Sequence, residues 1–216
     1  MNNTPINIKS LHINANKALK EKNYSQGKIL LEKILLINPN IFEVNFNLAM
    51  ISLQLDDLDT SIKYFEKAKK LNPNASRVYF NLGLVFDKKK EINLAIINYQ
   101  KVIELDPNNS YAFFNLGSLY QEIYDMEKAE QNLKKCLDLK PDFTYAFINL
   151  FDLYDRSNNL EKYSELLEKA KKILTEKELI SFYSGMYEYK KKNYKGVIEI
   201  LENINLNESN FIQNIT

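Results

Sequence analysis

The side chains that usually perform chemistry are scarce in this 216-residue sequence. His12 is the only histidine and Cys136 the only cysteine, so a histidine-based metal site or a catalytic triad lacks its components. Asp152 and Asp155 could share one helix face, but solvated carboxylates without apolar surroundings are poor general acids. Five glycines are too few and too scattered to form a phosphate-binding loop. The sequence therefore predicts no catalytic residue, no metal site, no cofactor and a chain that is not itself an enzyme.

Amides are the side chains whose type and spacing do suggest a function. Asn47, Asn81, Asn115 and Asn149 follow one another at intervals of 34 residues, each inside an apolar segment such as "FNLAM" or "FNLGL". An amide offers both an acceptor and a donor, so a row of amides can bond the main chain of an extended peptide whatever its side chains. The alternative is structural: each amide bonds between adjacent repeats, and both roles can coexist.

The same interval of 34 residues separates four of the five prolines, Pro39, Pro73, Pro107 and Pro141. A fixed period of this size predicts a stacked array of repeats. One helix should end before each proline, and the Asn or Asp after it should cap the next helix. Counting from the prolines gives an array over 8–206, tails at 1–7 and 207–216, and repeats 8–41, 42–75, 76–109, 110–143, 144–177 and 178–211, the last two degenerate.

Each repeat reads as two helices joined by a short polar turn. In the third repeat, Leu82, Gly83 and Phe86 lie on one face of a first helix, and Ala95 and Tyr99 on one face of a second. The fifth repeat has Thr175 in place of proline, and Thr175 with Glu178 predicts a T-x-x-E capping box for the next helix. The expected fold is all-α, with about six helix-turn-helix repeats.

These positions resemble those of tetratricopeptide repeat (TPR) proteins, whose pattern has Leu-Gly and Tyr on the first helix and Ala, an aromatic and Pro on the second. The fourth repeat carries Leu116, Gly117, Tyr120, Ala129 and Pro141 in this order. The resemblance implies a right-handed superhelical solenoid whose first helices line a concave groove. The "FNLG" columns are also similar to those of the TPR region of O-linked N-acetylglucosamine transferase. TPR arrays precede catalytic domains in that enzyme and in bacterial TPR–sulfotransferase fusions.

The resemblance also selects candidate groove residues from the first helix of each repeat. The phenylalanines before the asparagines could form apolar pockets or belong to the core, and the tyrosines lie one turn earlier. The predicted peptide-binding residues are Asn47, Asn81, Asn115, Asn149, Phe46, Phe80, Phe114, Arg77, Tyr111 and Tyr145.

The composition of the chain limits the classes of partner that it can bind. With 29 Lys and Arg against 28 Asp and Glu, the chain lacks the basic excess of a nucleic-acid binder. It also lacks a long apolar segment for membrane insertion, and one cysteine is compatible with the cytoplasm. We therefore expect a protein–protein interaction scaffold that binds an extended peptide.

The alternative is the substrate-recognition part of a larger transferase whose catalytic domain lies beyond Thr216. A third hypothesis is an assembly factor for a bacterial membrane complex. The last repeat lacks a polar capping helix, so truncation and self-association through this repeat are further expectations.

Overall fold

The computed structural model describes residues 7–203, with side chains through residue 200, and every regular element in this range is an α-helix. The predicted tails therefore lie outside the described residues, apart from Asn7. The described helices are α1 (Ile8–Lys20), α2 (Tyr24–Ile37), α3 (Phe42–Gln54), α4 (Leu58–Leu71), α5 (Ser76–Lys88), α6 (Ile92–Leu105), α7 (Ser110–Glu122), α8 (Met126–Leu139), α9 (Thr144–Arg156), α10 (Leu160–Ile173), α11 (Lys177–Lys190) and α12 (Tyr194–Asn203).

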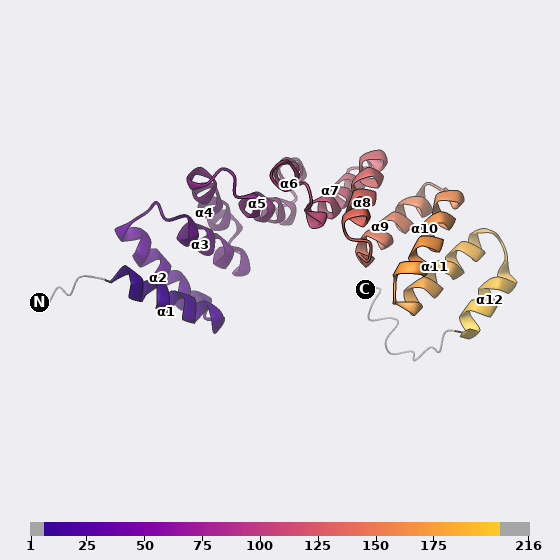
Figure 1. Ribbon diagram of the computed structural model, residues 1–216, viewed down its shortest axis with the longest axis horizontal. Helices are drawn as coiled ribbons and strands as arrows, with labels where there is room; N and C mark the ends of the chain where they lie inside the picture. Colours follow the sequence, from indigo (N-terminus) through magenta and orange to yellow (C-terminus); the bar gives the residue numbers. More distant parts are fainter. Residues whose placement is uncertain (1–6, 204–216) are drawn as a thin grey trace, which may run out of the picture. The chain divides into compact units, whose positions relative to one another are not determined.

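The chain divides into two compact units, Met1–Ala112 and Phe113–Thr216, and the division falls near the start of α7. Within the units, consecutive helices pair as α1 with α2, α3 with α4, α5 with α6 and α11 with α12 (Figure 1). The all-α helix-turn-helix fold is confirmed. The repeat boundaries drawn from the prolines stay a prediction.

The turn inside each repeat has one recurring geometry. Its central residue has a positive φ between 50° and 62°, and this happens at Lys22, Asp56, Lys90, Tyr124, Asn158 and Lys192, again at intervals of 34. The residue after it donates its N–H to the carbonyl five positions back, as Asn23 does to Ala18 at 2.8 Å. This bond is that of a Schellman motif, which satisfies carbonyls at the end of the first helix. The six described turns thus repeat more regularly than the sequence does.

The prediction that the Asn or Asp after each proline caps the next helix is wrong for α3 and α5. Asn40 and Asn74, which follow prolines, do not cap α3 and α5, whose N-cap residues make no side-chain bond. Instead, the side chain before the proline accepts the N–H of the residue after it, as Asn38 does from Asn40 at 3.0 Å. The reason is distance: the residue after the proline lies two positions before the helix. At Asn109, two residues after Pro107, the side chain does cap α7 by accepting the N–H of Ala112 at 3.1 Å.

The predicted capping box at Thr175 and Glu178 is also wrong. Helix α11 begins at Lys177 with Glu176 at its N-cap, and no side chain bonds the helix start. The Glu176 carboxylate instead accepts the N–H of Thr175 at 3.0 Å and the hydroxyl of Thr144 at 2.8 Å. Thr175 is thus bonded to Glu176 and does not cap the helix.

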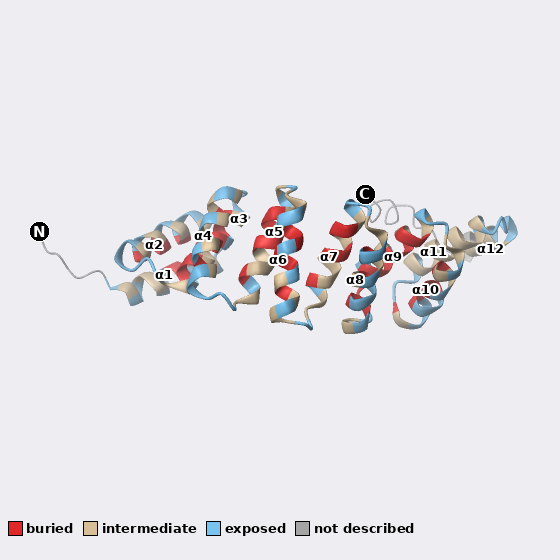
Figure 2. Cartoon of the chain, turned by 90° about the horizontal axis from the view of Figure 1, so that it is seen from above, coloured by how far each residue is buried: buried red, intermediate tan, exposed pale blue. Residues whose placement is uncertain are grey.

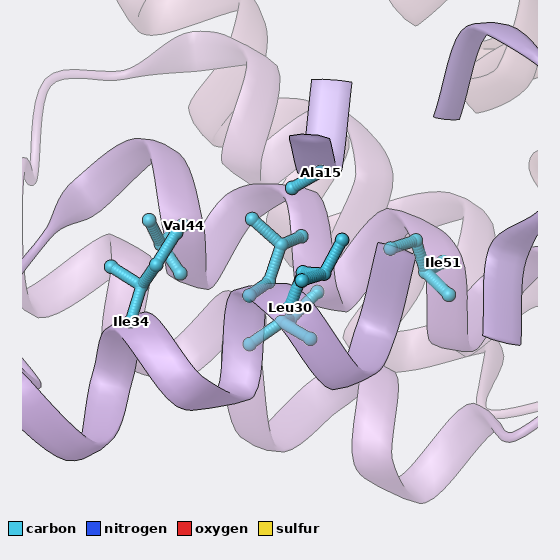
Figure 3. Close-up of a cluster of buried hydrophobic side chains, with 7 residues drawn as sticks. Ala15, Leu30, Ile34, Val44 and Ile51 are labelled. Atoms are coloured by element: carbon cyan, nitrogen blue, oxygen red, sulfur yellow. The ribbon is translucent and has the colours of Figure 1, made fainter. Parts of the chain in front are cut away.

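The core of the first unit lies where helices of successive repeats meet. Ala15 of α1, Leu30 and Ile34 of α2, and Val44 and Ile51 of α3 form one buried cluster, together with Leu31 and Leu48 (Figure 3). In Figure 2 buried and exposed residues lie on different sides of the same helices. Burying one face of each helix leaves the opposite face of the first helices available for contacts.

Close approach of the two helices within a repeat depends on small residues. A Cβ added at Gly117 would lie 2.6 Å from Cγ of Leu133, and one added at Gly83 would lie 2.7 Å from the Tyr99 ring. At Gly185 in the sixth repeat, the nearest atom would be Ile200 at 4.0 Å. Helix α11 also contains no buried residue. Packing is therefore looser in the sixth repeat than in the third and fourth.

Candidate functional site

A hollow of about 240 Å³ lies on the first unit, between α5 and the start of α7. Four of the predicted groove residues line it, namely Arg77, Phe80, Asn81 and Tyr111. The remaining lining residues are Ser76 and Asn109. Side chains about 30 residues apart in sequence, such as Asn81 and Tyr111, thus border one hollow of the first unit.

Arg77 connects two repeats at this surface. Its guanidinium pairs with the Glu43 carboxylate and lies over the rings of Phe46 at 4.4 Å and Phe42 at 5.0 Å. Arg77 and Glu43 occupy equivalent positions of α5 and α3. A planar guanidinium can stack on rings while it donates to a carboxylate. Arg77 therefore orders the polar edge of the hollow.

The three predicted phenylalanines are half-buried, and each packs against another ring. Phe46 meets Phe65 edge-on at 5.6 Å, and Phe80 meets Tyr99 in the same way at 5.6 Å. Phe114 lies 5.0 Å from Phe143. Each ring thus touches the core and keeps some exposed surface. A role as an apolar pocket for a ligand stays a prediction.

Tyr111 and Tyr145 are largely exposed, at 51% and 67%. Tyr145 packs at 6.4 Å from Phe114 and from Phe143, within the second unit. Exposed tyrosines combine an apolar ring with a hydroxyl and are typical anchors at interfaces.

The asparagine column is half-buried, but its members do not share one environment. Asn149 Nδ2 donates to Ser118 Oγ at 2.9 Å, which is a bond between the first helices of adjacent repeats. Asn81 Nδ2 donates to the carbonyl of Arg77 in its own helix at 2.7 Å. Among the described residues, the side chains of Asn47 and Asn115 make no hydrogen bond. The structural alternative therefore applies to Asn149, whose amide joins two repeats, whereas the amides of the other three make no bond to another repeat among the described residues.

The sequence analysis did not predict that Ser118 and Asn109 take part in these contacts. Ser118 lies one helical turn after Asn115, on the same face, and this spacing would have identified it. Asn109 lies in a turn, and only the start of α7 shows that it borders the hollow.

The strongest ionic cluster lies away from these residues, on α8, α9 and α10. Burial alone would raise the pKa of Glu130, but bonds from Lys134, Lys162 and Tyr154 lower this pKa to about 2. The two lysine Nζ atoms lie 2.7 and 2.8 Å from the carboxylate. This cluster joins successive repeats and stabilises them.

Two other kinds of site are absent from the described part of the chain. From residue 7 to residue 203, no helix has the length and apolar character needed to cross a membrane. No group of three or more His, Cys, Asp or Glu side chains suited to a metal ion is found in that range either.

Three segments of the chain match a known sequence family. Residues 42–75, 76–109 and 98–131 match three models, each described as "Tetratricopeptide repeat". The matched segments are tetratricopeptide repeats. Two of the matches begin and end with the predicted second and third repeats, and the third starts inside α6. No curated protein matches the chain.

Solved structures extend the likeness from single repeats to a TPR array. The crystal structure of MamA protein has a TM-score of 0.70 at 21% identity, over 76% of this chain and 92% of that one. PilF of Pseudomonas aeruginosa has a TM-score of 0.70 at 16% identity, over 89% and 88%. YrrB, described as "a TPR protein with an unusual peptide-binding site", has a TM-score of 0.64 at 22% identity, over 74% and 82%. These likenesses establish the fold as a TPR solenoid.

Proposed function

We propose that this chain is a protein-interaction scaffold that binds an extended peptide segment along the first helices of its repeats. The hollow beside α5 carries the proposal, because it brings together Arg77, Phe80, Asn81 and Tyr111. TPR arrays generally present such surfaces to protein partners. The unusual peptide-binding site of YrrB is a property of that protein, and it supports the same use here.

The hollow has the parts that a peptide site needs. Phe80 supplies a half-buried apolar floor, and the exposed Tyr111 ring offers a wall that a side chain of the ligand can cover. Asn81 keeps its Oδ1 for a main-chain N–H, because only its Nδ2 bonds the helix. Asn47 and Phe46 of α3 would extend the contacts within the first unit. In the second unit, Asn115, Phe114 and Tyr145 are further candidate contacts, whereas the amide of Asn149 is bonded to Ser118.

Panning a random-peptide display library against the full chain tests the proposal. Asn81→Ala and Tyr111→Ala should reduce the recovery of enriched peptides about tenfold, because each removes a contact at the hollow. Asn93→Ala and Tyr189→Ala are matched controls, since both residues are exposed and neither lines the hollow. Failure to enrich any peptide, or equal loss with the controls, would refute peptide binding at this surface.

Neither the family matches nor the solved structures favour the transferase alternative or the assembly-factor hypothesis. A donor-binding domain in the reading frame beyond Thr216 would decide for the transferase. The cytoplasmic location and self-association also stay predictions.

A further inference from the structure

The solvent-exposed face of the first helices differs between the two units. In α3 this face carries Glu43, Asn47, Met50 and Gln54, which are spaced at i, i+4, i+7 and i+11 and so lie on one side of the helix. The equivalent positions begin at Lys9 in α1 and at Arg77 in α5. We call these twelve positions of α1, α3 and α5 the first-unit stripe. Each of them is exposed or half-buried.

The middle of the first-unit stripe combines amides with exposed apolar side chains. Its amides are Asn16, Asn47 and Asn81, and its apolar residues are Ile13, Met50 and Leu84, which are 59%, 38% and 36% exposed. Exposed apolar side chains beside main-chain binding groups suit a ligand that buries its own apolar side chains while its backbone bonds the amides.

The two ends of the first-unit stripe are basic. Lys9 and Lys20 end the stripe on α1, and Arg77 and Lys88 end it on α5, against Glu43 as its one acidic member. Arg77 pairs with Glu43, and Lys88 lies 2.6 Å from Asp56. Neither Lys9 nor Lys20 makes an ion pair among the described residues. The first unit as a whole also has a net positive charge, with 15 Lys and Arg against 11 Asp and Glu in residues 1–112.

The equivalent face of the second unit is occupied by its own contacts. Ser118 stands where the first unit has Met50 and Leu84, and its hydroxyl accepts the amide of Asn149 at 2.9 Å. Gln121 Nε2 donates to the carbonyl of Asn149 at 3.1 Å, and Arg156 pairs with Asp152 at 2.8 Å. On α7 and α9 this face therefore has neither the apolar middle of the first-unit stripe nor unpaired lysines like Lys9 and Lys20.

On the basis of the peptide-binding function given above, we propose that the first-unit stripe binds an extended segment rich in Leu or Ile and in Asp or Glu. The stripe's amides hold the main chain, Ile13, Met50 and Leu84 cover the apolar side chains, and the basic ends pair with the carboxylates. Asn149 is bonded to Ser118 in the second unit and lies outside the stripe. Charge complementarity selects an acidic partner rather than a basic one.

Three labelled synthetic peptides test this specificity by fluorescence anisotropy with the full chain. They are repeats of Asp-Leu-Ser, of Lys-Leu-Ser and of Asp-Ser-Ser. The Asp-Leu-Ser peptide should bind at least about tenfold more tightly than the other two, and its affinity should fall as salt is added. Equal or tighter binding of the Lys-Leu-Ser peptide would overturn the proposal.

Amide variants test the division between the units. Asn47→Ala and Asn81→Ala should each weaken Asp-Leu-Ser binding about three- to tenfold. Asn149→Ala, the matched control, should lower the melting temperature and leave the affinity unchanged. An affinity loss with Asn149→Ala as large as that with Asn81→Ala would overturn the proposal. If library panning succeeds but the Asp-Leu-Ser peptide does not bind, the stripe's specificity is wrong while peptide binding stands. If panning itself fails, the proposed function falls.

Discussion

Adding one methyl group to each of two equivalent glycines should change the free energy of unfolding by different amounts. Gly117 of α7 and Gly185 of α11 both belong to the second unit and occupy the same place in repeats four and six. Neither has a positive φ, so alanine fits both backbones. Replacing glycine by alanine inside a helix contributes about 1 kcal/mol of helix propensity at either site.

The two sites differ in the space around the new Cβ. At Gly117 it would meet Cγ of Leu133 at 2.6 Å, Cδ2 of Leu133 at 2.9 Å and the Ala129 carbonyl at 3.3 Å. Leu133 is fully buried, so its branch point has no room to retreat. Overpacking of this kind costs about 1–3 kcal/mol. At Gly185 the nearest atom is 4.0 Å away, which is ordinary contact.

Gly185→Ala should therefore stabilise the protein by about 1 kcal/mol, and Gly117→Ala should leave it between unchanged and about 2 kcal/mol less stable. Because propensity contributes equally, the difference between the variants isolates the packing cost of about 1–3 kcal/mol. Thermal melting followed by far-ultraviolet circular dichroism should separate the two variants by several degrees. If Gly117→Ala melts at or above the temperature of Gly185→Ala, the argument from close helix approach is refuted.

Three further predictions concern single residues of the second unit. Glu130 has a lowered pKa of about 2, so its contribution is present above the ordinary pKa of 4.5 and is lost as pH falls towards 2. Urea unfolding should show that wild type loses about 1 kcal/mol more than Glu130→Gln between pH 6 and pH 2, an order-of-magnitude figure discounted for solvent screening. Tyr124 is 75% exposed with φ 61°, and Tyr124→Asn should raise stability by about 0.5–1 kcal/mol, measured in the same assay, because asparagine tolerates this conformation. Burial raises the pKa of the Cys136 thiol to about 11, so a thiol reagent at pH 8 should label the folded chain far more slowly than the chain in denaturant.

The helices and their pairing could be predicted because both depend on local patterns. Apolar spacing, small residues at close approaches and the interval between prolines recur within each repeat, and neighbouring residues decide them. The starts of α3 and α5 were predicted less well because two polar side chains flank each proline. The sequence does not say that Asn38, before the proline, bonds across it while Asn40, after it, does not cap.

The environment of each asparagine could not be predicted for a different reason. Asn81 and Asn149 have the same place in the period and similar neighbours in sequence. Their bonds depend on which side chain the previous repeat offers. Ser118 bonds Asn149, whereas the equivalent position before Asn81 is Met50, which has no hydrogen-bonding group of this kind. Only the structure shows that Ser118 reaches Asn149. A column read from spacing alone identifies equivalent positions but does not assign them one function.

The turns inside the repeats explain why the period survives where its sequence signals fade. None of the six residues with positive φ is glycine, although this conformation costs an ordinary residue about 1 kcal/mol or more. The cost is tolerated because the turn is held from both sides. The Schellman bond closes the first helix, and in five of the described repeats an Asn or Asp caps the second, as Asp125 does by accepting the N–H of Lys128. The Schellman bond is also present in the sixth repeat, where the N–H of Asn193 donates to the carbonyl of Glu188. It forms although Thr175 takes the place of proline at the end of the fifth repeat. Proline therefore marks the period in the sequence, whereas the hydrogen bonds of the turn maintain it in the structure.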